Sequence, residues 1–294
     1  MKNDFINQFI GEIELLTPYL PQDFFKKCLK YQSIFHINIP KTGSTFLNHL
    51  LKTNYLIKSY RPPHGTCSRL RLSPDPTDGI SGKQPTLYQN LEGFKESLKI
   101  SIVRNPYDWL VSFYFHEELR KKKNVNKLRP STSEVESLEI ARIKGVGSLR
   151  KLYTTFEDFV FAYSDPDAYW PQGLIGFKNF FPFQMFDDEG VCQADYCLRN
   201  ETLSLSIYSL FLGFGVDCRA AQDVLRADKK NVSLTRKRKD YREYYNDKMV
   251  LALEDKFKNI NKHMGYSFEK PILSDQFIIS LKNLNYSPID NRII

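Results

Sequence analysis

SIFHINIPKTGSTFLNHLL, residues 33–51, contains a strand, a tight polar turn and the start of a helix. Apolar residues alternate over 33–39, as in a buried strand, and recur at helical spacing after Thr45. Such a turn gathers backbone N–H groups and the positive end of a helix dipole around one point, which suits a phosphate. Gly43 allows close backbone approach, while Ser44 and Thr45 offer hydroxyl donors. Lys41 adds a positive charge, so the sequence predicts a phosphate-binding loop.

KISIVRNPYDWLVSFYF, residues 99–115, repeats the order of strand, turn and helix. Pro106 is well suited to a first helical turn. Arg104 can bind a phosphate in a forked, charge-assisted geometry, and Ser112, two helical turns further on, can add a hydroxyl donor. Parallel neighbouring strands would bring both turns to the carboxyl edge of the sheet, the usual ligand edge of open α/β folds.

The alternation of strands and helices predicts an α/β fold, with a central parallel sheet flanked by helices in a single domain. We expect a helical extension over 1–30, the domain over 31–270, and a tail over 271–294 that packs on it. Within the domain, the charged segment 117–148 predicts a mobile insertion, and the Pro- and Gly-rich segment 61–90 predicts a loop. Further helices are expected at 91–97, 155–163, 201–213, 217–227 and 241–262.

Composition narrows the class of protein. A chain of 294 residues that is 41% hydrophobic can bury a substantial core, and a net charge of +8 indicates an anionic partner. Five cysteines at irregular spacings, without a CxxC pair, predict reduced thiols and no zinc site. The amphipathic start, MKNDFINQFIGEIELL, resembles neither a signal peptide nor a membrane span, so we expect a cytoplasmic protein.

The two turn motifs together resemble those of a known family. Residues 36–47 look like the 5′-phosphosulfate motif of sulfotransferases that use 3′-phosphoadenosine 5′-phosphosulfate (PAPS), especially the carbohydrate-type branch with its heparan, chondroitin and bacterial members. Residues 102–114 are similar to the family's 3′-phosphate motif, and the two motifs occur in the family's order. More loosely, residues 195–203 resemble a later family segment, and residues 231–245 resemble the basic loop that closes over the nucleotide. The resemblance implies the P-loop-like sulfotransferase fold.

The resemblance also implies a reaction and a set of site residues. A sulfuryl group would pass from PAPS to a hydroxyl or amine of a saccharide or small natural-product acceptor, by in-line displacement without a required metal. Lys41 would stabilise the leaving phosphate and His64 would act as general base. The implied donor-binding residues are Lys41, Thr42, Gly43, Ser44, Thr45, Phe46, Arg104, Ser112, Arg199, Arg236, Lys237 and Arg238.

Other readings of single residues stand beside these roles. Glu92 and Glu96 are alternative bases, and His116 can be read as an acceptor-site residue or as a packing residue. His36 lies inside a strand and is expected in the core. Lys41 can also be read as an exposed lysine on a turn, and the basic run 236–239 as a solvated surface.

Two alternative functions also remain at this point. One is a kinase-like nucleotide enzyme, although the pattern GxxxxGK[ST] and an acidic Mg²⁺ motif are missing. The other is a basic nucleic-acid-binding protein, although no helix-turn-helix, zinc or RNP pattern occurs. The sequence therefore favours an enzyme with a small-molecule or saccharide acceptor, without a nucleic-acid partner or a membrane span.

Overall fold

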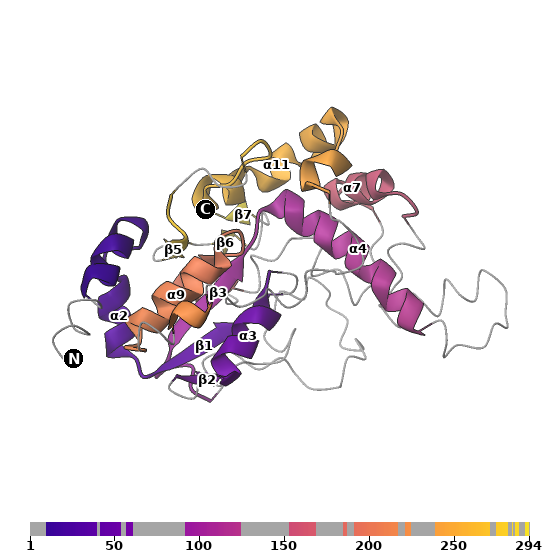
Figure 1. The fold of residues 1–294 in the computed structure, drawn as a ribbon. Coiled ribbons are helices and arrows are strands. Elements are labelled where there is room, and N and C mark those ends of the chain that lie inside the picture. The colour runs from indigo at the N-terminus through magenta and orange to yellow at the C-terminus, as the bar shows by residue number, and fades with distance from the viewer. Residues whose placement is uncertain are drawn as a thin grey trace.

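Five strands form the central sheet, in the order β2-β1-β3-β4-β5 (Figure 1). In this computed structural model the described residues are 10–39, 42–53, 57–60, 92–124, 153–168, 185–186, 191–216, 221–224, 239–270, 275–281, 284, 286–287 and 292–293. The strands are β1 (Ser33–Ile37), β2 (Lys58–Tyr60), β3 (Leu98–Val103), β4 (Tyr196–Arg199) and β5 (Ile278–Ser280). The first four are parallel, and β5 pairs antiparallel with β4. The predicted α/β fold with a mostly parallel sheet is confirmed.

Helices cover both faces of this sheet (Figure 1). One face carries α4 (Pro106–Asn124), α7 (Phe156–Ser164) and α11 (Asp247–Met264). The other carries α2 (Phe24–Lys30), α3 (Ser44–Thr53) and α9 (Leu203–Gly213). The short η1 (Thr17–Tyr19) and η6 (Tyr241–Tyr244) are 3-10 helices, and β6 (Tyr286–Ser287) pairs with β7 (Arg292–Ile293) in a separate ribbon.

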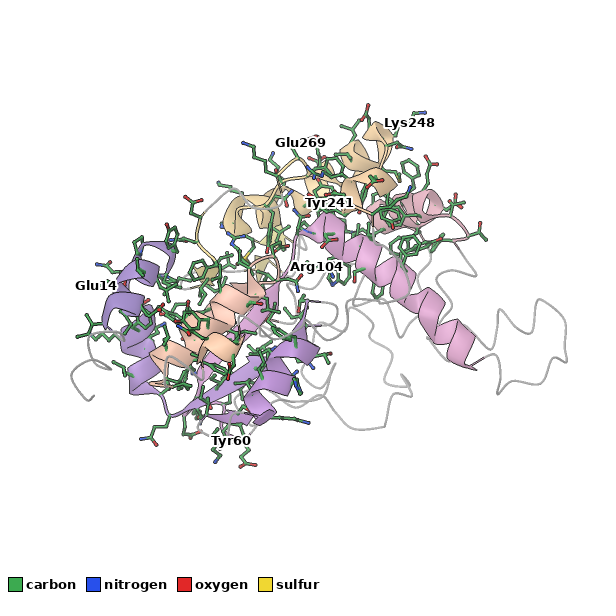
Figure 2. The ribbon with its side chains drawn as sticks, viewed as in Figure 1. Glu14, Tyr60, Arg104, Tyr241, Lys248 and Glu269 are labelled. Atoms are coloured by element: carbon green, nitrogen blue, oxygen red, sulfur yellow. The ribbon has the colours of Figure 1, made fainter. Side chains whose placement is uncertain are left out.

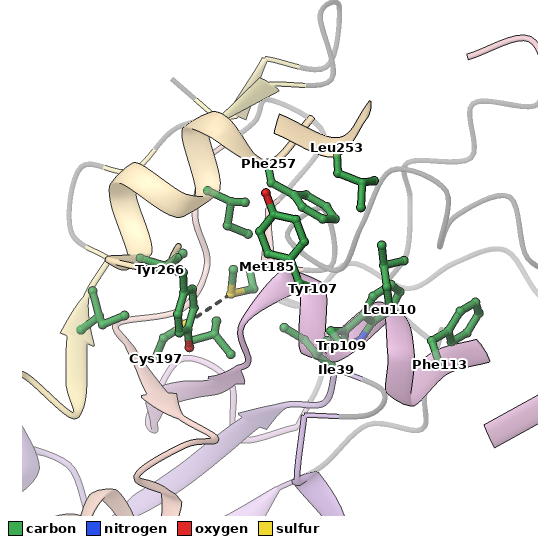
Figure 3. Packing of buried hydrophobic residues seen from close by; sticks show 14 of the residues in the cluster. Ile39, Tyr107, Trp109, Leu110, Phe113, Met185, Cys197, Leu253, Phe257 and Tyr266 are labelled. Atoms are coloured by element: carbon green, nitrogen blue, oxygen red, sulfur yellow. Dashed lines mark hydrogen bonds between the residues drawn. The ribbon is translucent and has the colours of Figure 1, made fainter. Parts of the chain in front are cut away.

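The two faces follow from the alternation of side chains along each strand. In β1, Phe35 and Ile37 join the core beneath α4 and α11, whereas Ile34 joins the core beneath α3 and α9. The first of these cores is strongly aromatic, and Figure 3 shows Tyr107 and Trp109 of α4 packed among residues of α11 and β4. Because the sheet is covered on both faces, β1, β3 and β4 are buried along almost their whole length, whereas the edge strand β2 is largely exposed.

Local signals explain where the helices begin and end. Asn105 caps α4, because its Oδ1 accepts the N–H of Tyr107 at 3.0 Å. Asn246 caps α11 in the same way, accepting from Met249, and Gly265 ends α11 in the left-handed region with φ 61°. This cap explains why the predicted helix 241–262 is wrong at its start: η6 and α11 are separate, with extended backbone at Asn246 between them.

Other boundaries also differ from those predicted. Helix α4 continues to Asn124, well past the start of the predicted insertion at 117, while residues 125–148 lie outside the described ones. Residues 92–96 form turns and not the expected helix. Part of the predicted tail 271–294 is β5, a strand of the central sheet, because β4 offers its backbone edge for pairing there.

The N-terminal extension is part of the core. Phe24 and Cys28 of α2 are buried in the same hydrophobic cluster as residues of α9. Helix α2 is therefore part of the layer that covers this face of the sheet. Cys28 and Cys197 are buried and form no disulfide within the described part of the chain, while Cys67 and Cys218 lie outside the described residues. No helix of the described part of the chain is both long and apolar enough to cross a membrane.

Candidate active site

The first predicted loop lies where β1 ends and α3 begins. Its hydroxyl groups close the turn on itself: Thr42 and Ser44 both donate to the carbonyl oxygen of Ile39, at 2.9 and 3.0 Å. Thr45 is exposed at the first turn of α3, whereas Phe46 is buried in the core and its N–H donates to the carbonyl of Gly43 at 3.0 Å. The Phe46 side chain therefore anchors the helix, and Thr45 is placed toward solvent.

Gly43 explains the shape of this turn. Its φ of 98° lies in the left-handed region, which only glycine adopts without strain. A Cβ at this position would lie 2.6 Å from Nδ2 of Asn200 and 2.7 Å from Cδ2 of Leu203. The loop that follows β4 thus packs directly on the phosphate loop, and Asn200 Nδ2 donates to the carbonyl of Thr42 at 2.8 Å.

A buried pair supports α3 from beneath. His36 in β1 lies 3.1 Å, through Nδ1, from Oδ1 of Asn48, and Asn48 Nδ2 in turn donates to the carbonyl of Ser44. Since the amide oxygen can only accept, Nδ1 of His36 carries the proton. His36 is fully buried, as expected of a core histidine, and it holds α3 against β1.

The second predicted loop lies where β3 passes into α4 (Figure 2). Arg104 is only 7% exposed, and its Nε donates to Oδ2 of Asp108 at 2.6 Å. Asn105 is held on three sides: its Oδ1 caps α4, its Nδ2 donates to the carbonyl of Ser267 at 2.8 Å, and its N–H donates to Oε1 of Glu201 at 2.7 Å. Ser112 follows on α4 and is half-buried.

The residues after β4 join the two loops. The N–H of Asn200 donates to the carbonyl of Val103 at 2.8 Å, directly before Arg104. Asn200 then contacts the first loop through Thr42, and Glu201 contacts the second loop through Asn105. Sequence reasoning gave neither bridging residue a role, although both directly follow Arg199 in the segment that resembled the family.

Glu201 lies in a buried polar network. Its Oε2 accepts the hydroxyl of Tyr266 at 3.0 Å, and the Arg199 guanidinium lies 4.9 Å from the centre of the Tyr266 ring. Burial raises the pKa of Glu201, while hydrogen bonds from Asn105 and Tyr266 and the charge of Arg104 oppose that shift. Burial likewise raises the pKa of Tyr266 far above its ordinary value.

Arg199 ends β4 and is 2% exposed. Its Nε donates to the carbonyl of Gln276 at 2.6 Å, so this contact is with the segment before β5. Its Nη1 is buried and has no hydrogen-bond partner among the described atoms. A buried guanidinium nitrogen without a hydrogen bond is costly to stability, and here the guanidinium packs on the Tyr266 ring.

Several predicted site residues lie outside the described part of the chain. These are Lys41, His64, Arg236, Lys237 and Arg238. The basic run nevertheless comes just before η6, which packs against α4, and Tyr245 donates its hydroxyl to the carbonyl of Tyr107 at 2.8 Å. The chain after the run is therefore fixed beside the Arg104 loop.

The two alternative bases lie away from the two loops. Glu92 and Glu96 are exposed in the turns that precede β3, which places them at the amino edge of the sheet, opposite the two loops. The side chain of His116 lies outside the described ones. Within the described residues no group of three or more His, Cys, Asp or Glu side chains is arranged to hold a metal ion.

Comparison with known protein families shows the family to which this chain belongs. The model of the sulfotransferase family matches residues 28–206, more than half of the chain, and spans both loops and the bridging residues. The chain belongs to the sulfotransferase family, whose members include carbohydrate sulfotransferases, and it is an enzyme that uses PAPS as sulfuryl donor. Searches of curated proteins and of solved structures gave no match. Family membership decides against the kinase-like and nucleic-acid-binding hypotheses.

Proposed function

We propose that this enzyme transfers the sulfuryl group of PAPS to a hydroxyl or amine of a saccharide acceptor. The observation that carries the proposal is the junction of two anion-binding turns at one sheet edge, tied together through Asn200 and Glu201. PAPS carries anionic groups on both sides of its ribose, so its binding requires two such turns at a fixed separation. The branch of the family that the motifs resemble supports a saccharide as acceptor.

The described residues fit this donor. The N-terminus of α3 and the Gly43 turn would take the 5′-phosphosulfate, because helix N-termini favour anions. Arg104 and Ser112 would take the 3′-phosphate, and the ion pair with Asp108 holds the guanidinium in place beforehand. Arg199, at the carboxyl end of β4, would be a further donor residue for the nucleotide.

The chemistry is a single displacement at sulfur. The acceptor oxygen or nitrogen forms a bond to sulfur while the bond from sulfur to the phosphate oxygen breaks, leaving 3′-phosphoadenosine 5′-phosphate. We assign Lys41 to stabilising the charge that develops on the leaving oxygen, and His64 to removing the acceptor proton. The basic run Arg236, Lys237 and Arg238 would close over the 3′-phosphate, since η6 fixes the following residues beside α4.

Calorimetric titration with 3′-phosphoadenosine 5′-phosphate tests the donor site. The wild type should bind without Mg²⁺, and Arg104→Ala should weaken binding about tenfold to a hundredfold, as expected for loss of a charge-assisted hydrogen bond. Lys258→Ala, which removes an exposed lysine of α11, is the matched control and should bind like the wild type. Folded wild-type protein that does not bind the nucleotide would refute the proposed function.

Turnover measurements test the two catalytic assignments. Lys41→Ala should lower kcat far more than it lowers nucleotide affinity, because its charge acts on the leaving group. His64→Ala should lower kcat about a hundredfold and remove the acid limb of the pH profile, because a general base must be unprotonated to act. An unchanged kcat in either variant would remove that residue from the mechanism.

A further inference from the structure

The second loop is held by a side chain from another part of the chain. The backbone N–H of Asn105 donates a hydrogen bond to the buried carboxylate of Glu201 at 2.7 Å. The same carboxylate accepts a hydrogen bond from a buried tyrosine hydroxyl at 3.0 Å. The tyrosine, Tyr266, follows α11 and lies outside the residues matched by the family model. A donor-binding loop is thereby connected to a part of the chain far away in sequence.

We propose that Glu201 is a positioning residue, which sets the Arg104 loop for the donor's 3′-phosphate and is itself held by Tyr266. This inference rests on the proposed function. Glu201 does not need to touch the donor, because its effect passes through the backbone of Asn105, the residue directly after Arg104. Fixing the Asn105 N–H fixes the peptide plane that joins it to Arg104, and hence the direction in which the arginine side chain leaves the strand.

The surroundings of Glu201 support this role over simple packing. Burying a carboxyl group costs stability, so a side chain that only filled space would more favourably be apolar. Both of its oxygens instead receive hydrogen bonds, one from each of the two segments that it joins. The guanidinium of Arg199 covers the Tyr266 ring, and Ser267, the next residue, accepts from the Asn105 side chain at 2.8 Å. Two consecutive residues thus support the loop, Tyr266 through Glu201 and Ser267 through the Asn105 side chain.

The distinguishing measurement compares two nucleotides. Adenosine 5′-phosphate has no 3′-phosphate, so the ratio of its Kd to that of 3′-phosphoadenosine 5′-phosphate reports on the Arg104 loop alone. A purely structural role for Glu201 would lower the folded fraction and affect both nucleotides equally. A positioning role lowers the ratio, because only the 3′-phosphate depends on the direction of Arg104.

Glu201→Ala should weaken binding of 3′-phosphoadenosine 5′-phosphate about tenfold and leave adenosine 5′-phosphate within about twofold, because it removes the acceptor of a charge-assisted hydrogen bond. Glu201→Gln should recover most of the affinity, since an amide can accept from Asn105 and donate to Tyr266. Tyr266→Phe, which keeps the ring and so tests the role without emptying the core, should lower the ratio about threefold.

Tyr196→Phe is the matched control. Its hydroxyl also donates to a carboxylate, Oδ1 of Asp23 at 2.6 Å, but it stands at the amino end of β4, away from the loops. This variant should keep the wild-type ratio. If Arg104→Ala weakens binding but Glu201→Ala and Tyr266→Phe keep the wild-type ratio, the positioning role is overturned and the donor site stands. If the wild type binds neither nucleotide, the proposed function itself has failed.

Discussion

Replacing Gly43 with alanine should disrupt the phosphate loop through both its backbone and its neighbours. The residue has φ of 98°, and a left-handed conformation costs a non-glycine residue about 1–2 kcal/mol. The new Cβ would also lie 2.6 Å from Asn200 Nδ2, which must move and give up its bond to Thr42, worth about 1 kcal/mol. Displacing the buried Leu203, 2.7 Å away, adds about 1–3 kcal/mol of overpacking. We expect Gly43→Ala to lower the free energy of unfolding by about 3–6 kcal/mol.

The variant Gly215→Ala separates the backbone cost of the Gly43→Ala substitution from the cost of its side-chain clashes. Gly215 also has a positive φ, 75°, but a methyl group added there would have no atom within 4 Å other than its own neighbours along the chain. Its alanine variant should therefore lose only the conformational part, about 1–2 kcal/mol. Urea denaturation of both variants gives the difference, and nucleotide titration should show weaker binding for Gly43→Ala alone. Equal losses in the two variants, or unchanged nucleotide affinity in Gly43→Ala, would refute the claim that the loop after β4 packs on this turn.

Two further predictions concern the core and the buried carboxyl group. Trp109 is fully buried and stacks on Phe113 at 5.0 Å, so Trp109→Ala should lower the free energy of unfolding by about 3–5 kcal/mol in urea denaturation; a loss below about 1 kcal/mol would contradict this packing. Because burial raises the pKa of Glu201 despite Arg104 and Tyr266, folding favours its protonated form, and that stabilisation is present at acid pH and lost as pH rises through the raised pKa. The melting temperature of Glu201→Gln relative to the wild type should thus increase from about pH 4 to pH 8, and a constant difference would be inconsistent with the raised pKa.

The parts of this fold that were predictable carry local signals. The strand and helix on either side of Gly43, and those on either side of Arg104, are recognisable by apolar periodicity and by the turn residues between them. We predicted that the two strands are parallel neighbours with both loops at the carboxyl edge of the sheet, as is usual in open α/β folds. The parallel pairing of β1 with β3 confirms this. The order of the two motifs then pointed to the sulfotransferase family.

The missed parts depend on contacts between distant segments. Nothing near Asn200 or Glu201 in sequence shows that one binds Thr42 and the other Asn105, because these bonds exist only once β4 lies beside β3. In the sequence, Tyr266 is indistinguishable from the other aromatic residues, because its hydrogen bond to Glu201 depends on the folded structure. The strand β5 was likewise unpredictable, since a three-residue strand has too few positions to show a period.

The pairing of β5 with β4 has a consequence for how the protein is made. The Arg199 side chain binds Gln276, a residue 77 positions later, and the Glu201 carboxylate meets Tyr266 65 positions later. A ribosome therefore releases both nucleotide motifs well before the residues that brace them. Until those residues emerge, the nascent chain has an unpaired β4 edge, and its Arg104 loop lacks the support that Tyr266 gives through Glu201. An unpaired strand edge of this kind is a binding site for chaperones. Competence to bind the sulfuryl donor would thus arrive late in synthesis, as a product of completed folding.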